Sequence, residues 1–91
     1  MVYEWDETKR QKNIEKHGLD LARGLYVYES PDKTTYESHR LHELRWSDIA
    51  LIDDELMTLT LTYTFRGDAV RFISLRKASR KERRLHSGQN S

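Results

Sequence analysis

Apolar residues recur along this chain with two different periods, and the change of period separates predicted helices from predicted strands. From Thr58 to Phe65, leucine and aromatic residues alternate strictly with threonines, which is typical of a strand buried on one face. Around Leu21, Leu25 and Tyr28 the spacing is four and then three residues, the period of a helix with one buried stripe. The pattern predicts helices in the first third of the chain and strands in its second half.

The first predicted helix has clear start and stop signals. The segment Val2 to Trp5 is β-prone and stops at Asp6, whose carboxylate can cap the amide groups of a helix from Glu7 to about His17. Gly18 then supplies a left-handed end. This helix has little apolar surface, so we expect it to lie on the surface of the protein.

The second predicted helix begins after Asp20 and ends before Pro31. Gly24 lies within it and weakens it by about 1 kcal/mol relative to alanine. The segment from Asp32 to Glu43 is polar and lacks a clear period. We interpret that segment as a loop, with at most a short strand at Thr34 to Tyr36.

Three further strands are predicted to form an antiparallel meander, namely Arg45 to Ile52, Thr58 to Phe65 and Ala69 to Leu75. Asp53-Asp54-Glu55 is expected to turn between the first two strands, and Gly67-Asp68 between the last two. The predicted fold class is α+β, with an antiparallel sheet of three or four strands, two N-terminal helices and a basic C-terminal helix. We expect one domain over residues 1–91.

The last predicted helix, Lys77 to His86, lies in the most basic part of the chain. Between Arg76 and His86 six Lys or Arg residues stand against Glu82 alone, a local charge of +5, whereas the whole chain carries +1. A helical projection puts the arginines on one side, Ala78 and Leu85 on the other, and Glu82 at the border. A basic end on an acidic body favours a polyanionic partner, of which nucleic acid is the commonest.

Composition narrows the class of protein. The chain has 91 residues and no cysteine, which excludes a disulfide framework and a thiolate zinc site. Its four histidines lack a close spacing to other ligand residues, so neither a metal site nor a cofactor is predicted. The sequence contains no signal peptide or membrane-spanning run, and a cytoplasmic location is expected.

Two ordered motifs stand at the two ends of the chain. The first comprises Glu4-Trp5-Asp6, Lys9, Asn13 and Lys16-His17-Gly18, followed by Pro31, and the second runs from Arg71 to Glu82 as RFISLRKASRKE. Together they resemble the BrnT family of toxins from bacterial type II toxin–antitoxin systems. Leu75 replaces a usual alanine, Ala50 a frequent glycine, and His86 a common tyrosine.

The resemblance implies a RelE-like fold and a ribonuclease that inhibits translation. It also implies a partner, a ribbon-helix-helix antitoxin of the BrnA type, usually in a 2:2 complex that is joined through the antitoxin and represses its own operon. Operator DNA would then be contacted only through the antitoxin, and RNA would be the substrate.

Cleavage of RNA without a metal requires a base for the 2′-hydroxyl, a cation for the phosphoryl oxygens and an acid for the leaving 5′-oxygen. His17, at a helix end that favours the imidazolium, suits the acid or a phosphate contact, and Glu82 suits the base. The predicted catalytic residues are His17, Arg76, Arg80, Glu82 and His86. The predicted RNA-binding residues are Lys16, Arg71, Lys77, Arg83 and Arg84.

Two other hypotheses fit parts of the pattern. The basic helix could bind RNA or an antitoxin without chemistry, in a module that acts only in operon repression. A DNA-binding protein is the weakest alternative, because the sequence has no helix-turn-helix spacing and no Asn or Gln among the arginines of its last helix.

Overall fold

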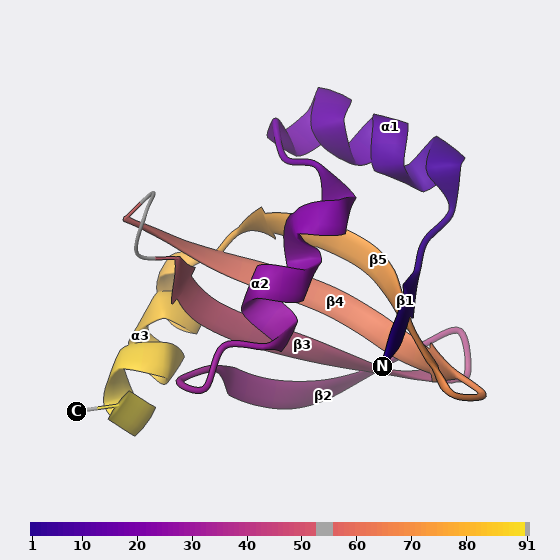
Figure 1. Cartoon of the computed structure of the whole chain (residues 1–91). Coiled ribbons are helices and arrows are strands. Elements are labelled where there is room, and N and C mark those ends of the chain that lie inside the picture. The colour runs from indigo at the N-terminus through magenta and orange to yellow at the C-terminus, as the bar shows by residue number, and fades with distance from the viewer. Residues whose placement is uncertain (53–55, 91) are drawn as a thin grey trace.

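A five-stranded sheet in the order β1-β5-β4-β3-β2 forms the centre of the computed structural model, which describes residues 1–52 and 56–90 (Figure 1). The elements in chain order are β1 (Val2–Glu4), α1 (Glu7–His17), the 3-10 helix η1 (Leu21–Arg23), α2 (Gly24–Tyr28), β2 (Thr34–Arg40), β3 (Glu43–Ile52), β4 (Met57–Arg66), β5 (Ala69–Lys77) and α3 (Arg80–Asn90). The α+β class with N-terminal helices and a C-terminal helix is confirmed. The RelE-like fold stays a prediction.

The sheet is mixed, and the expected purely antiparallel sheet of three or four strands is wrong. Strands β2 to β5 form an antiparallel meander, but β1 joins the edge of β5 in parallel, with Val2 opposite Ala69. The β-prone start of the chain was visible in the sequence. Its partner was not, because three residues are too short to show a period and the pairing spans nearly the whole chain.

The segment interpreted as a loop is in fact β2 and the start of β3. The two strands pair from Thr34 opposite Ile49 to Arg40 opposite Glu43. They are joined by Leu41 and His42, both with positive φ (51° and 64°), in a tight turn without glycine. Neither face of β2 is apolar, so alternation of apolar and polar residues gave no signal. The turn expected at Asp53-Asp54-Glu55 lies outside the described residues.

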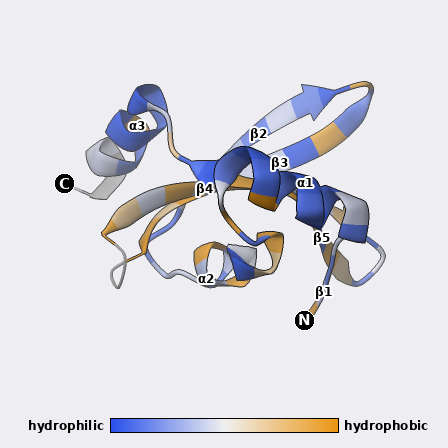
Figure 2. Ribbon diagram, turned by 90° about the horizontal axis from the view of Figure 1, so that it is seen from above, coloured by the Kyte–Doolittle hydropathy of each residue, from blue (hydrophilic) through white to orange (hydrophobic). Residues whose placement is uncertain are grey.

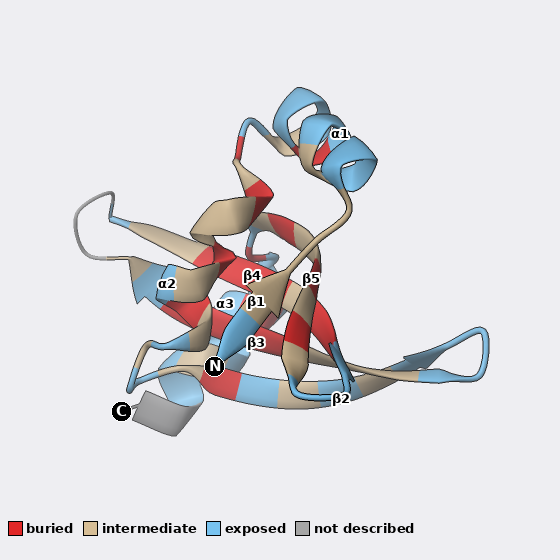
Figure 3. Cartoon of the chain, turned by 45° about the vertical axis from the view of Figure 1, so that its right-hand side comes forward, coloured by how far each residue is buried: buried red, intermediate tan, exposed pale blue. Residues whose placement is uncertain are grey.

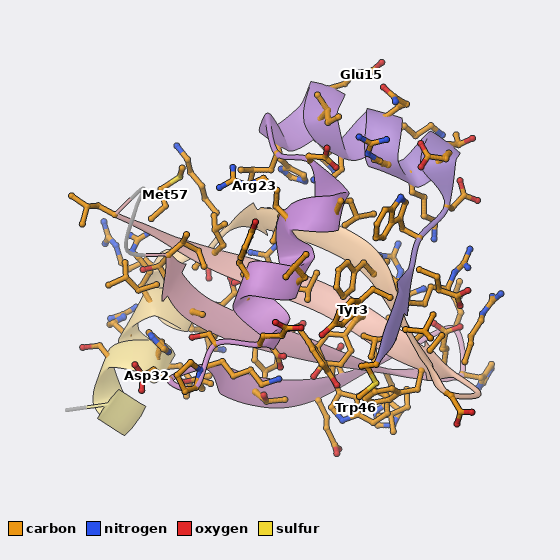
Figure 4. The ribbon with its side chains drawn as sticks, viewed as in Figure 1. Tyr3, Glu15, Arg23, Asp32, Trp46 and Met57 are labelled. Atoms are coloured by element: carbon orange, nitrogen blue, oxygen red, sulfur yellow. The ribbon has the colours of Figure 1, made fainter. Side chains whose placement is uncertain are left out.

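One face of the sheet carries the hydrophobic core, and we call it the core face. The helices η1 and α2 pack on it, and α1 rests on β5 (Figures 1 and 2). Buried positions concentrate on the central strands (Figure 3), and the largest fully buried apolar side chains of the core face are Phe72, Leu21, Leu59, Leu61, Leu75, Val27 and Val70. Ile49 is also fully buried, but it lies on the opposite face, in register with Thr34 and Thr60. Aromatic rings continue this layer toward the end of the sheet that lies away from α3, where Tyr3 and Trp46 are seen (Figure 4).

Gly24 is where the core face meets α2 most closely. A Cβ atom at this position would lie 2.6 Å from Cδ1 of Leu61 and 3.1 Å from the ring of Phe72. Glycine at this position lowers the helix propensity of α2, but it allows the helix to pack closely on the sheet.

Helix α1 lies on the surface as predicted, with Asp6 accepting from the amides of Thr8 and Lys9 at its start and Gly18 at φ 70° after its end. Its attachment is polar. The side chain of Asn13 is buried and donates through Nδ2 to the carbonyls of Leu19 and Leu75, both at 2.8 Å, while its Oδ1 accepts from the Leu75 amide at 3.0 Å. Asn13 thus ties α1 to β5.

Helix α3 begins at Arg80, so the predicted helix over Lys77 to His86 starts too early. Arg76 and Lys77 belong to β5. Ala78 is buried as expected, but Leu85 is 42 % exposed and Glu82, placed at the border by the helical projection, is only 7 % exposed. Helix α3 lies on the side of the sheet opposite α2 (Figure 2), against β2 and β3. Among the described residues, no helix is long and apolar enough to span a membrane.

Candidate active site

Three polar side chains from three elements meet near the start of α3. They are Arg76 of β5, Glu82 of α3 and Tyr36 of β2, and we call them the Arg76 cluster. Arg76 donates through Nη1 to Glu82 Oε1 at 2.6 Å and through Nη2 to Oε2 at 2.9 Å. The Tyr36 hydroxyl donates to the same Oε2 at 2.5 Å. The cluster therefore links an edge strand, an inner strand and the last helix.

A capping box holds Glu82 in this position. The Glu82 amide donates to Ser79 Oγ at 3.1 Å, and the Ser79 amide donates to Glu82 Oε1 at 2.8 Å. The sequence Ser79-Arg80-Lys81-Glu82 contains the Ser-x-x-Glu pattern of this motif, so the start of α3 could have been predicted from it. The box turns Glu82 toward the sheet.

The charges in the cluster are fixed at neutral pH. Burial by itself would raise the pKa of Glu82, but hydrogen bonds from Arg76, the Ser79 amide and Tyr36 outweigh it and hold the pKa at about 2. Burial, and then the hydrogen bond to Glu82, raise the pKa of Tyr36, and the bond to Glu82 raises the pKa of Arg76. The resting cluster consists of a carboxylate, a guanidinium and a protonated phenol.

Hydrogen bonds through both terminal nitrogens hold the guanidinium of Arg76 in place. Nη1 donates to Glu82 and also to the carbonyl of Lys77 at 3.3 Å, and Nη2 donates to Glu82. A guanidinium has five N–H donors in a planar fork, and a parallel pair of them has the geometry that a phosphate accepts bidentately.

Two hollows adjoin the Arg76 cluster, and Tyr36 and Arg76 line both. The first, of about 640 Å³, lies along α3 and is lined by Tyr36, Arg76, Ser79, Lys81, Glu82, Arg84 and Leu85. The second, of about 410 Å³, lies over the sheet and is lined by Tyr36, Ser38, His39, Arg40, Arg45, Ser47, Thr62, Ile73, Ser74 and Arg76. The cluster thus stands where two basic hollows meet.

Of the residues predicted in the C-terminal segment, the fold brings Arg76, Glu82 and Arg84 to these hollows. Arg80 is exposed on α3, and Arg83 donates to the carbonyl of Ala78 at 2.9 Å. His86 Nδ1 lies 2.9 Å from Thr34 Oγ1, so this histidine faces the sheet one turn beyond the cluster. Lys77 is exposed at the end of β5.

The predicted residues of α1 and of the start of β5 lie outside the linings of both hollows. Burial, Lys16 and then Arg76 lower the pKa of His17, so the expectation that the helix end favours its imidazolium is wrong. His17 still approaches the cluster, because Asn13 one turn earlier is bonded to Leu75, next to Arg76.

Arg71 lies near the β1 edge, where its Nη1 is 3.6 Å from Glu4 Oε1. Five residues of strand, roughly 16 Å, separate its backbone from that of Arg76. We conclude that Arg71 does not contribute to the Arg76 cluster.

Sequence reasoning missed Tyr36 and the polar residues of the second hollow. The missed residues of β2 lie in the segment interpreted as a loop, whereas Arg45, Ser47, Thr62 and Ser74 lie on strands that were predicted but were not assigned to a site. The local signal for β2 was its β-prone start, Thr34-Thr35-Tyr36, because both faces of the strand are polar. Within residues 1–52 and 56–90, no three or more His, Asp or Glu side chains form a group that could hold a metal ion.

A family model described as the ribonuclease toxin BrnT of type II toxin–antitoxin systems matches residues 5–82. The chain belongs to the BrnT family. The matched segment contains Tyr36, Arg76 and Glu82, whereas Arg84 and His86 follow its last residue. As a BrnT toxin, the chain has RNA as its target and an antitoxin as its partner. No curated protein matches the chain.

Proposed function

We propose that this BrnT chain is an endoribonuclease that cleaves RNA without a metal ion, with Arg76 holding the scissile phosphate, and that this cleavage inhibits translation in the cytoplasm. The observation that carries the proposal is the pairing of Arg76 with Glu82, which fixes the guanidinium where two basic hollows meet. A preorganised cation is what the charge developing on a phosphoryl group requires. Lys81 and Arg84 line the first hollow together with Arg76.

Glu82 serves as the proton acceptor in this proposal once RNA is bound. In the resting cluster its pKa of about 2 makes it a poor base. A phosphate that shares Arg76 weakens the hold of the guanidinium on the carboxylate, and the pKa of Glu82 rises. The carboxylate can then accept the proton of the attacking 2′-hydroxyl.

Tyr36 completes the proposed proton transfer. Its raised pKa keeps the phenol protonated, and its hydroxyl already contacts Glu82. When Glu82 gains a proton, its negative charge no longer holds the hydroxyl proton of Tyr36 in a hydrogen bond. Tyr36 can then protonate the leaving 5′-oxygen. Glu82 then returns its proton to the Tyr36 oxygen, which restores both groups.

The other predicted residues have supporting parts in this proposal. His17 and Lys16 contact RNA that extends past the end of α1, and Arg80, Lys77 and Arg83 add positive charge along its path. His86 steadies α3 against Thr34. The antitoxin is proposed to be a ribbon-helix-helix protein of the BrnA type in a 2:2 complex, with operator DNA contacted through it, and residues 1–91 to form one domain.

A non-catalytic module that binds RNA or antitoxin is the second candidate. One observation favours it: four hydrogen bonds from three groups saturate the Glu82 carboxylate, as in an ion pair whose role is structural. The two candidates differ in whether RNA is broken.

The experiment that separates them uses antitoxin-free protein, labelled RNA and EDTA. The wild type is expected to cleave, Arg76→Ala to lose cleavage much more than binding, and Arg66→Ala, which removes an exposed arginine at the end of β4 outside both hollows, to behave almost as the wild type. RNA that is bound but left intact between about pH 6 and 8, the range in which general acid–base groups usually operate, would support the binding module instead.

A further inference from the structure

Four hydroxyl side chains form a row across the antiparallel strands on the face opposite the core. Tyr36 pairs with Ser47, Ser47 with Thr62, and Thr62 with Ser74, so the row crosses β2, β3, β4 and β5 at one level. All four line the second hollow, and Ser47 Oγ lies 3.2 Å from Thr62 Oγ1. With neighbouring strands about 4.8 Å apart, the row is about 14 Å long.

Packing gives no reason for this row. On the core face the same strands bury Ala50, Leu61 and Tyr63, whereas three members of the row, Tyr36, Thr62 and Ser74, are only half-buried and border an open hollow; the fourth, Ser47, is buried. A surface of hydroxyls that both donate and accept hydrogen bonds is suited to a polar ligand lying along the sheet.

Arginines stand on both sides of the row. Arg76 lies two residues after Ser74 on β5, and Arg45 lies two residues before Ser47 on β3, which runs in the same direction. The two arginines are therefore about 13 Å apart along the strands. Arg40 ends β2 on the same side as Arg45 and is exposed, while Arg45 uses its Nε to contact Glu43 at 3.0 Å.

The chemistry that matches this arrangement is a sugar–phosphate chain with 2′-hydroxyls. Guanidinium groups bind phosphates, and hydroxyl groups between them can exchange hydrogen bonds with riboses. We propose that the open sheet face is a second RNA subsite, in which Arg40 and Arg45 bind a phosphate that flanks the one held by Arg76 and the hydroxyl row contacts the riboses between. The subsite rests on the proposed function for the position of the scissile phosphate.

The test compares a dinucleotide, which carries only the scissile phosphate, with a single-stranded RNA pentanucleotide. For the double variant Arg40→Ala/Arg45→Ala, kcat/KM is expected to fall about tenfold on the pentanucleotide, through KM, and to stay within about twofold on the dinucleotide. Lys9→Ala/Lys12→Ala, at two exposed lysines of α1, is the matched loss of two charges and should leave both substrates unaffected. Equal losses on both substrates, or no loss on either, would overturn the subsite.

Binding gives an arm that does not depend on cleavage. Since each phosphate contact on a single strand contributes about 0.7 to the slope of log K against log salt, and both arginines bind one phosphate, the double variant should lower the slope by about 0.7. If the wild type leaves RNA intact, the proposed function fails, but this weaker and less salt-dependent binding should remain. Variants that lose antitoxin binding while their RNA binding and its salt slope stay unchanged would show a protein interface and refute the subsite.

The hydroxyl row has its own expected result. The wild type should bind an RNA pentanucleotide more tightly than the DNA pentanucleotide of the same sequence, and Thr62→Val/Ser74→Ala should reduce that preference severalfold. Thermal melts check that both proteins fold. An unchanged preference in the folded variant would remove the hydroxyl row from the subsite.

Discussion

The two faces of the sheet are made by the same strands but have opposite chemistry. On β4, Leu59, Leu61 and Tyr63 point into the core, whereas Thr60 and Thr62 belong to the face that bears α3 and the open hollow. The core face is closed by short helices, and the other face is left partly open. A chain this small thus concentrates its stability on one face and its candidate chemistry on the other.

The separation is not complete. Ile49 is fully buried on the face that bears α3, and the core face holds a buried carboxyl group. Asp48 is fully buried and accepts hydrogen bonds from Lys33 at 2.7 Å, Thr35 at 2.6 Å and Tyr63 at 3.0 Å. These contacts secure the start of β2 to β3. The hydrogen bonds to Asp48 therefore also support the open face, because they hold β2, which contributes Tyr36.

The largest expected effect is a loss of RNA cleavage caused by a substitution on the open face alone. Arg76→Ala should lower the rate of RNA cleavage by about 10²- to 10³-fold, the usual cost of removing a preorganised charge contact. Arg76→Lys should recover only part of it, because an ammonium cannot form the fork. Single-turnover rates, with circular dichroism to confirm folding, measure both. If Arg76→Lys matched the wild type, the bidentate contact would be wrong.

The next effect is a loss of stability caused by a substitution on the core face alone. Gly24→Ala should lower the free energy of unfolding by about 1–3 kcal/mol, because its Cβ would overlap Leu61 and Phe72. The control is Gly88→Ala on α3, where a Cβ meets nothing within 4 Å and the change should be neutral or slightly favourable. Urea denaturation gives both values. Cleavage per folded molecule should stay unchanged in both variants, and a large loss in Gly24→Ala would contradict independent faces.

The third effect is a pH dependence carried by Glu82. Its pKa is about 2 in the folded protein, below the ordinary value of 4.5, so the stability it contributes is complete above about pH 4.5 and is lost as the pH falls toward 2. Partial exposure of Arg76 reduces this contribution to about 2 kcal/mol. Glu82→Gln should remove the decline across that window in acid unfolding curves. A curve for the variant that parallels the wild type would show that the ion pair adds no stability.

The smallest expected effect concerns His86. In this account it packs α3 on Thr34 and takes no part in proton transfer, so His86→Ala should reduce cleavage by less than about threefold and stability by about 1 kcal/mol or less. The rate and the urea midpoint measure these. A loss as large as that of Arg76→Ala would restore His86 to the catalytic residues.

The sequence predicted those parts of the fold that have a local cause. The ends of α1 were predicted from Asp6 and Gly18, because helix caps act over a few residues. Strand β4 was predicted because one of its faces is apolar. Strand β2 was missed because both its faces are polar, and the parallel pairing of β1 because its partner is distant in the chain. The burial of Asn13 could not be predicted, since its partner Leu75 lies 62 residues away in the chain.

Prediction of the candidate site was divided in the same way. Arg76 and Glu82 were named from the C-terminal motif, but they were placed on one helix, whereas they come from a strand and a helix. Tyr36 was absent because it lay in the misinterpreted segment. His17 was given the wrong preferred charge, because the helix end was considered, whereas burial, and after it Lys16 and Arg76, lowers the pKa of this histidine.

The most direct test of the Arg76 cluster is the chemistry of the RNA ends after cleavage in EDTA by antitoxin-free protein. Attack by the 2′-hydroxyl, with Arg76 on the phosphate and Glu82 and Tyr36 moving the protons, predicts 2′,3′-cyclic phosphate and 5′-hydroxyl ends, produced by the wild type and nearly absent with Arg76→Ala. Intact RNA, or products with 3′-hydroxyl and 5′-phosphate ends, would contradict it.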